Sequence, residues 1–338
     1  MNNKPLTRET IESLPKVELH LHLDCCLGFD AVSALRPGIT REEYNHEFIG
    51  PSKYKDLAAF LKTIDSSLEL MQWEKALRLV TRDLFQQLKR DNVIYAEIRF
   101  APLLHLQQGL SPREVVGIVE EAVSRSVEET GIEARLILCT LRHYSKEQSM
   151  TTVQLVEAFR GTRVAALDIG ADEAGFPLDA HIPAFLYANE RQLFCTAHAG
   201  EAKGPDSVWE TLRHLNPSRI GHGVRSIEEP ELLEELKKKN IHLEVCPSCN
   251  IQIDVFDTYG DHPIHRLYNA GVSLGINTDT RTITGISLSD EYLRLHRVFG
   301  WGTEHFLRCN RNALAAAFLP GSNKQSLEKK LSAGYRDW

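Results

Sequence analysis

The stretch LFCTAHAGEAKGPDSVWETLRHLNPSRIG, residues 193–221, predicts a strand, a helix and a second strand. The runs Leu193–His198 and Arg219–Gly221 are short and apolar, whereas Asp206–Leu215 between them has a helical pattern. This order is typical of a βαβ unit, in which the two strands run parallel.

The same alternation repeats along the chain. We predict six further strands, at Val17–His22, Val93–Phe100, Arg135–Leu141, Val164–Ile169, Ile241–Cys246 and Val272–Asn277. Helical patterns occur at Pro112–Thr130, Thr151–Arg160 and Pro230–Lys239. Eight strands with helices between them favour an α/β fold of the (β/α)8 or TIM-barrel type, and a doubly wound open sheet is the structural alternative.

The 338 residues fit one domain over residues 1–338, because a TIM barrel needs about 250 residues plus insertions. The stretch from about Pro37 to Arg90 is too long for one crossover, so it predicts a helical insertion after the first strand that caps one end of the barrel. The tail from about Ser287 to Trp338 predicts extra helices that cover the outside. Neither GxGxxG nor a P-loop opens any predicted helix, so dinucleotide and P-loop binding have no support.

The composition is that of a globular protein, with 42% hydrophobic and 25% charged residues. A net charge of −7 argues against a binder of nucleic acid, which needs basic patches. The sequence contains no run of 18 apolar residues and no apolar leader, so we expect neither a membrane span nor a signal peptide. Seven cysteines, an odd number, favour reduced thiols and a cytoplasmic location. The oligomeric state stays undetermined.

Four predicted strands end in candidate metal ligands. His20 and His22 lie two apart on the first strand, so their side chains point to the same face, about 6–7 Å apart. His198 ends the fifth strand and Asp279 follows the eighth. Because barrel active sites form at the carboxyl ends of the strands, we expect these groups to meet. Three imidazoles and a carboxylate are typical of a site for zinc or a similar divalent ion.

Two further residues are candidates for acid–base chemistry. A metal lowers the pKa of its water to about 7, and His222, which ends the sixth strand, is predicted to serve as a base or orienting group for that water. Glu201 follows His198 by three residues and can give and take a proton at the substrate. The alternatives are a histidine held in a tight turn and a carboxylate at a helix N-terminus.

The segment His242-Leu243-Glu244 with Cys246-Pro247-Ser248-Cys249 suggests two other zinc motifs. The HxE and PCxxC motifs of zinc deaminases lie on separate helices, and the proline here follows the first cysteine. A zinc ribbon needs a second CxxC, which the sequence lacks. We therefore interpret the segment as a buried strand that ends in a turn, and Cys25-Cys26 as packing residues.

Taken together, five segments resemble the adenosine deaminase family of the metal-dependent amidohydrolases. They are PKVELHLHLD (15–24), YAEIRFAP (95–102), TAHAGE (196–201), RIGHG (219–223) and NTD (277–279), in family order over about residues 12–300. The resemblance implies a (β/α)8 barrel that binds one Zn²⁺ per chain and acts on a purine nucleoside and water.

The same resemblance assigns roles to residues. His20, His22, His198 and Asp279 are implied to be zinc ligands, and Glu201 the proton donor to the ring nitrogen beside the attacked carbon. His222 and Asp279 are implied to position and activate the hydroxide. Asp24 matches the residue that contacts the ribose. Leu57, Phe60, Leu61 and Ile64 match an apolar lid, for which the alternative is an ordinary amphipathic helix face.

Three positions depart from the family pattern, and all of them lie in the implied substrate pocket. The family commonly has a second aspartate where this chain has Thr280, whose hydroxyl can still donate a hydrogen bond to the purine. Ala171 replaces a glycine whose backbone N–H approaches the purine, and Cys25-Cys26 replaces glycine and a small residue. Deamination of adenosine or 2′-deoxyadenosine is the leading hypothesis. The alternatives are deamination of adenine, a modified adenosine or aminodeoxyfutalosine, and a nucleoside-binding protein without catalysis.

Overall fold

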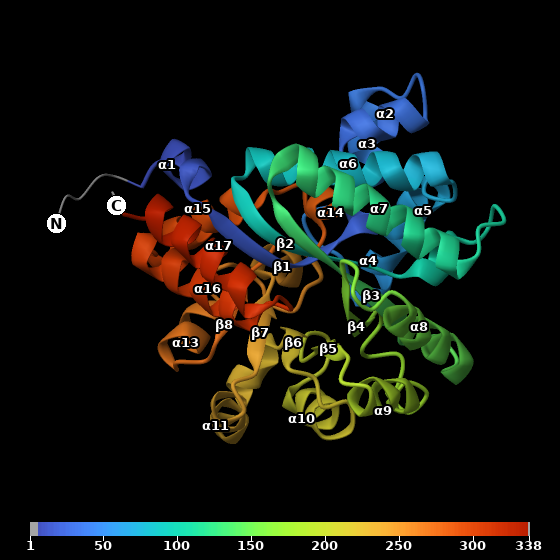
Figure 1. Cartoon of the computed structure of the whole chain (residues 1–338). Coiled ribbons are helices and arrows are strands. Elements are labelled where there is room, and N and C mark those ends of the chain that lie inside the picture. The colour runs from blue at the N-terminus through green and yellow to red at the C-terminus, as the bar shows by residue number, and fades with distance from the viewer. Residues whose placement is uncertain (1–5, 337–338) are drawn as a thin grey trace.

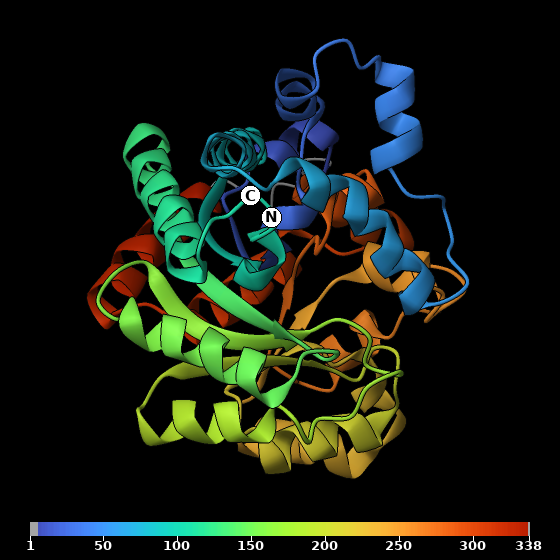
Figure 2. The same cartoon turned by 90° about the vertical axis from the view of Figure 1, so that its right-hand side faces the viewer.

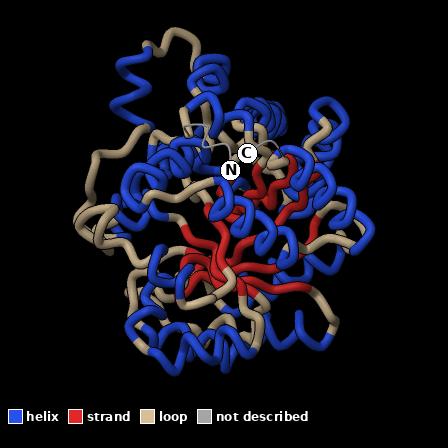
Figure 3. The backbone as a smooth tube through the Cα atoms, turned by 90° about the vertical axis from the view of Figure 1, so that its left-hand side faces the viewer, coloured by secondary structure: helices blue, strands red, loops and turns tan. Residues whose placement is uncertain are grey.

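Eight parallel strands form the centre of the protein (Figures 1 and 3). The computed structural model describes residues 6–336. The strands pair in chain order and are β1 (Lys16–His22), β2 (Val93–Phe100), β3 (Glu133–Leu141), β4 (Val164–Gly170), β5 (Phe194–Ala199), β6 (Arg219–His222), β7 (His242–Val245) and β8 (Leu274–Ile276). The first strand meets the segment after the eighth, since His22 N donates to Asp279 O at 2.8 Å and Asp279 N to His20 O at 3.0 Å. This closure confirms the barrel and excludes the open sheet.

Helices follow the strands and surround the barrel (Figure 1). The main ones are α6 (Glu74–Arg90), α7 (Pro112–Thr130), α8 (Lys146–Ala158), α9 (Ile182–Glu190), α10 (Pro205–His214), α11 (Pro230–Lys238) and α13 (Ile264–Asn269). Local chemistry fixes their ends. In α7, Ser111 and Glu114 form a capping box, Pro112 occupies the first turn, and Gly131 ends the helix in the left-handed conformation at φ 73°.

Shorter elements carry the chain across the carboxyl ends of the strands. They are η1 (Leu23–Cys25), η3 (Pro102–His105), η4 (Val224–Glu228), α12 (Pro247–Gln252) and α14 (Arg281–Thr284). Each follows a strand within a few residues, so these turns hold the side chains at that mouth of the barrel.

The predicted insertion exists, with different boundaries. It consists of α2 (Phe29–Leu35), α3 (Arg41–Phe48), α4 (Leu57–Leu61), η2 (Lys62–Ile64) and α5 (Asp65–Leu70). Helix α6, which the prediction included, is the first crossover helix of the barrel and packs beside α7. Two backbone bonds tie the insertion down, from Gly50 N to Ile283 O and from Tyr54 N to Gln252 O. Figure 2 shows α2 and α3 projecting from the barrel.

The tail forms α15 (Leu288–Phe299), α16 (Thr303–Ala316) and α17 (Gly321–Gly334), and α1 (Arg8–Ser13) packs against α15. The sequence predicted helices on the outside, but part of the tail closes the amino-terminal mouth of the barrel. Ala313 and Leu314 of α16 pack on Val17 and Leu19 of β1, and Phe318 packs on side chains of β3 and β4.

None of the helices in residues 6–336 is long and apolar enough to cross a membrane. All seven cysteines are buried free thiols.

Candidate functional site

The three histidines and the aspartate predicted as ligands meet at the carboxyl-terminal mouth of the barrel. Nε2 of His22 lies 3.3 Å from Nε2 of His198 and 3.3 Å from Oδ1 of Asp279. Nε2 of His20 also lies 3.3 Å from Oδ1 of Asp279. Strand β1 supplies two of these groups, β5 one, and the turn after β8 one.

The outer nitrogens of two of these rings are held by buried carboxylates. His20 Nδ1 lies 2.9 Å from Glu244 Oε2, and His198 Nδ1 lies 3.1 Å from Asp168 Oδ2. Arg99 bridges the two carboxylates, at 2.5 Å from Glu244 and 2.7 Å from Asp168. This arrangement directs each Nε2 to the centre of the mouth, as in many histidine metal sites.

This donor set fits a divalent metal ion. His20 Nε2 is fully buried and makes no hydrogen bond, although it lies near Asp279. A buried nitrogen without a partner costs free energy that a bound cation would recover. Burial lowers the pKa of His22 well below its usual value, which keeps that imidazole neutral as a ligand must be. Three imidazoles with one carboxylate suit zinc.

Glu201 and His222 lie beside this set. Glu201 Oε1 accepts a hydrogen bond from Asn250 Nδ2 at 2.8 Å and lies 3.2 Å from His222 Nδ1. Burial, reinforced by the charges of Asp279 and Glu173, raises the pKa of Glu201 well above its usual value. Burial lowers the pKa of His222 well below its usual value. Burial thus favours the protonated form of the Glu201 carboxyl and the neutral form of the His222 imidazole.

Two of these residues have strained backbones. His222 has φ 61° and Asp279 has φ 64°, in the left-handed region that costs a non-glycine residue about 1–2 kcal/mol. Strain of this kind collects at functional sites. In each case the turn aims the side chain at the mouth of the barrel.

Glu173 holds the turn that carries Glu201. Its buried carboxylate accepts hydrogen bonds from the backbone N–H groups of residues 200 to 203, at 2.7–3.0 Å, and one from Ser207 Oγ. The turn after β5 thus folds around one carboxylate, which fixes where Glu201 stands.

The predicted lid covers these groups. Leu57, Phe60, Leu61 and Ile64 line a cavity of about 50 Å³ together with His22, His198, Glu201, His222 and Asp279. A second cavity of about 460 Å³ shares His22, Leu61, Ile64 and Ala171 with the first, so the two are neighbours. Asp24 lines the larger one, and burial raises the pKa of its carboxyl to about 6.

The three departures from the family pattern all lie against this space. Ala171 has φ 74°, so it adopts the backbone conformation of the glycine that it replaces, and its side chain lines both cavities. Cys25 and Thr280 line the smaller cavity. Oγ1 of Thr280 is buried and makes no hydrogen bond, so it is available to a ligand.

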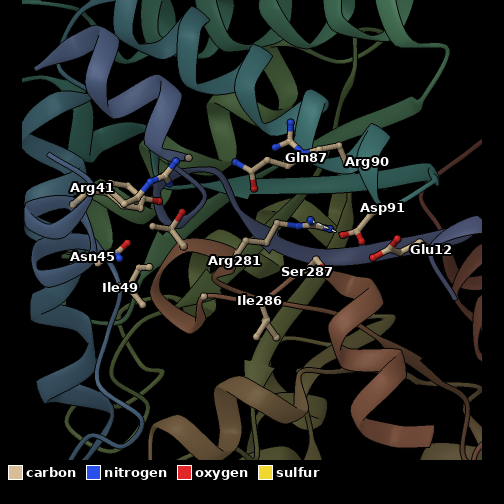
Figure 4. Close-up of a pocket in the computed structure, with 14 residues that line it drawn as sticks. Glu12, Arg41, Asn45, Ile49, Gln87, Arg90, Asp91, Arg281, Ile286 and Ser287 are labelled. Atoms are coloured by element: carbon tan, nitrogen blue, oxygen red, sulfur yellow. Dashed lines mark hydrogen bonds and ion pairs between the residues drawn. The ribbon is translucent and has the colours of Figure 1, made fainter. Parts of the chain in front are cut away.

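Arg281 supports the turn that carries Asp279 and Thr280. Its guanidinium pairs with Glu18 of β1 at 2.6 Å and with Asp91 at 2.8 Å, and Glu18 also accepts from Thr278 N at 3.0 Å. Figure 4 shows Arg281 reaching toward Asp91 in a separate pocket, of about 380 Å³, that is lined by the insertion, the end of α6 and residues 281–287. These two ion pairs of Arg281 hold the turn in place.

Sequence reasoning missed several supporting residues. Asp168, Glu173 and Asn250 carry no motif of their own in one sequence, although Asp168 and Glu244 do lie near the carboxyl ends of predicted strands. The interpretation of residues 242–249 as a buried strand that ends in a turn is right for β7, but the residues after it form helix α12. It missed that Cys249 faces the catalytic cavity.

Known proteins resemble this chain in sequence and in fold. The sequence model of the family described as adenosine deaminase matches residues 15–333. The adenosine deaminase of Clostridium acetobutylicum is 34% identical, with 96% of this chain and 99% of that protein covered. That of Lacticaseibacillus paracasei is 32% identical, with 97% and 98% covered.

Solved structures agree on the fold. An adenine deaminase from Arthrobacter aurescens has a TM-score of 0.88 at 25% identity and covers 96% of this chain and 99% of its own. An N6-methyl-AMP deaminase from Arabidopsis thaliana has a TM-score of 0.86 at 27% identity and covers 98% and 100%. These neighbours act on different aminopurines.

Proposed function

The chain belongs to the adenosine deaminase family of hydrolytic deaminases, and on that premise we propose that it deaminates adenosine and 2′-deoxyadenosine. The products are inosine or 2′-deoxyinosine and ammonia. One observation carries the proposal: three imidazoles and a carboxylate converge beside Glu201, beneath an apolar lid.

One zinc ion per chain, held by His20, His22, His198 and Asp279, completes the proposed site. When bound, zinc supplies Lewis acidity that lowers the pKa of water to about 7. Glu244 and Asp168 keep the two rings that they contact in the orientation that holding the ion requires.

Glu201 is the proposed proton donor. Because burial raises its pKa and so favours the protonated carboxyl, it can give a proton to the ring nitrogen next to the attacked carbon. The Asn250 side chain and the Glu173 turn fix its position. Protonation of that nitrogen makes the neighbouring carbon more electrophilic, which favours addition of hydroxide. The carbon–nitrogen bond to the amino group then breaks as the carbonyl forms: the amino group leaves as ammonia with the proton that the attacking water gave up, and the added hydroxyl returns a proton to Glu201.

His222 and Asp279 orient the attacking water in this proposal. Nε2 of His222 lies 3.8 Å from Oδ2 of Asp279, so the two groups flank one point at the mouth. A neutral imidazole can accept the water's proton, and its left-handed backbone keeps the ring aimed at that point.

The two cavities support a nucleoside in preference to a base or a nucleotide. Free adenine would leave empty the cavity of about 460 Å³ that Asp24 lines. The ribose of a nucleoside can occupy that cavity. A 5′-phosphate would meet Asp24, Asp65 and Asp172 there, and Lys62 is the one lysine or arginine among the described lining residues. Thr280 Oγ1 and the Ala171 backbone offer hydrogen bonds to the purine.

A substrate panel tests the proposal. Zinc-loaded protein is mixed with adenosine, 2′-deoxyadenosine, adenine, AMP, N6-methyl-AMP and aminodeoxyfutalosine, and absorbance reports the loss of the amino group. We expect the highest kcat/KM for the two nucleosides. Turnover of another aminopurine with adenosine untouched overturns the proposed substrate, and binding without any turnover supports a nucleoside-binding protein instead.

A further inference from the structure

A cysteine thiol points to a second function of the catalytic cavity. Cys249 belongs to α12, directly after β7, and is 1% exposed. It lines the small cavity with Glu201 and Asp279. One ligand atom from each of these three residues lies within 4.8 Å of the other two.

This group differs from the proposed zinc set, with which it shares only Asp279. The Asp279 carboxylate has two oxygens: Oδ1 faces His20 and His22 at 3.3 Å, and Oδ2 lies on the side of His222 at 3.8 Å. A carboxylate so placed can serve two neighbouring sites, as in two-metal centres.

The chemistry of the donors selects the ion. A thiolate with two carboxylates suits thiophilic cations such as Zn²⁺ and Cd²⁺, whereas Mg²⁺ and Ca²⁺ prefer oxygen donors alone. Thr280 adds a separate observation, since its Oγ1 is buried, lines the same cavity and makes no hydrogen bond. This hydroxyl can accept a hydrogen bond from a water on the ion.

We infer that Glu201, Cys249 and Asp279 form a second, inhibitory site for a thiophilic divalent cation. Binding there releases the Cys249 thiol proton and the proton of the Glu201 carboxyl to solvent, because the thiolate and the carboxylate are the ligands. It also engages the Glu201 carboxyl, which the proposed function requires as a proton donor. An excess of zinc or cadmium therefore inhibits turnover in competition with the purine.

The test begins with protein that carries one equivalent of zinc and adds Cd²⁺. Three readouts are followed together: the cadmium–thiolate charge-transfer absorbance, the metal content per chain, and aminopurine turnover. We expect the wild type to take up one equivalent of cadmium with thiolate absorbance, to keep its zinc, and to lose turnover as cadmium binds.

The key variant is Cys249→Ser, and Cys25→Ser is its matched control, because Cys25 lines the same cavity but lies outside the group of three. We expect Cys249→Ser to bind the added cadmium about 100-fold more weakly or worse, since even an outer partner of a metal ligand is worth about 10–100-fold. Cys25→Ser should bind it like the wild type. Glu201→Gln, which keeps the side-chain shape, should also weaken the added cadmium.

Three results overturn the inference: a wild type that takes up no cadmium beyond its zinc, equal cadmium affinity in Cys249→Ser, or thiolate absorbance that disappears with Cys25→Ser instead. The inhibition rests on the proposed function, but absorbance and metal content do not. If the singly loaded protein turns over no aminopurine, the proposed function fails while these two measurements still decide the second site.

Discussion

The two mouths of the barrel are built in opposite ways. The carboxyl-terminal mouth holds two cavities, unpartnered buried groups at His20 and Thr280, and backbone strain at His222 and Asp279. The amino-terminal mouth is filled by the chain's own tail. There Phe318 N donates to Glu97 Oε1 at 2.6 Å, and the Arg219 guanidinium lies 3.7 Å from the centre of the Phe318 ring.

Between the mouths lies a layer of buried ion pairs. Arg219 contacts Glu97 on the tail side and Glu244 on the catalytic side, and Glu244 contacts His20. On the tail side the layer meets packed side chains, although Arg219 Nε and His242 Nε2 make no hydrogen bond there, and on the other side it faces the two cavities. The two mouths therefore differ in open space: the tail fills the barrel at one end, whereas the other end keeps cavities for a ligand, as is usual for barrel enzymes.

We expect the largest effect from a substitution at the carboxyl-terminal mouth. We expect Glu201→Gln to lower kcat about 10²–10⁴-fold, because an amide cannot act as the proton donor. Metal content and the thermal midpoint should stay close to those of the wild type. A kcat within a few-fold of the wild type contradicts the assigned role.

Phe318→Ala tests how much the tail stabilises the amino-terminal mouth. We expect a loss of about 3 kcal/mol in the free energy of unfolding, because the ring is 5% exposed and stacks on Phe194. Urea unfolding measures this, and kcat/KM at a permissive temperature should be retained. The matched control is Phe176→Ala, whose ring is 41% exposed and lines the larger cavity. It should leave stability nearly unchanged and raise KM, and the opposite pattern breaks the comparison.

Lys16, at the start of β1 near the amino-terminal mouth, should make the free energy of unfolding depend on pH. Burial lowers its pKa from 10.5 to about 8, while its Nζ donates to Leu14 O and Asp91 O. Between these pKa values the unfolded chain binds a proton that the folded protein lacks, so the Lys16 contribution to stability rises with pH from about 8 to 10.5. Relative to Lys16→Met, the wild type should gain about 1–3 kcal/mol. A stability difference that does not change with pH contradicts this account.

The smallest effect concerns strain at the catalytic mouth. Ala171→Gly should stabilise the protein by about 0.5–1 kcal/mol, because relief of the left-handed alanine exceeds the added freedom of the unfolded chain. Thermal unfolding checks this, and the KM for adenosine shows whether the Ala171 side chain limits the cavity. A lower midpoint indicates that the methyl group contributes more by packing than it costs in strain.

Much of this site could be predicted from the sequence alone. Strand periodicity placed His20 and His22 on one face, and the ends of three other strands located His198, His222 and Asp279. The order of elements predicted the barrel, and the length of the first connection predicted the insertion. The predicted boundaries of the insertion differ from those of the structure, because the pattern of a single helix does not show whether it packs on the barrel, and of the helices between β1 and β2 only α6 is a crossover helix.

Other features had no local signal. Asp168, Glu173 and Asn250 matter because of what they contact across about 30 to 50 residues of chain. The tail carried a helical pattern, yet nothing in that pattern said that Phe318 would enter the barrel.

Amino-acid order alone therefore sets the parallel strands, the residues at their carboxyl ends and the metal-binding chemistry, because alternation along a strand is a local property. Only the closed barrel decides which donors stay unsatisfied, which carboxylates hold the rings, and that Cys249 stands beside Glu201 and Asp279. Those facts depend on contacts between segments far apart in the chain. Close packing and the need to pair buried polar groups select such contacts when the whole barrel forms.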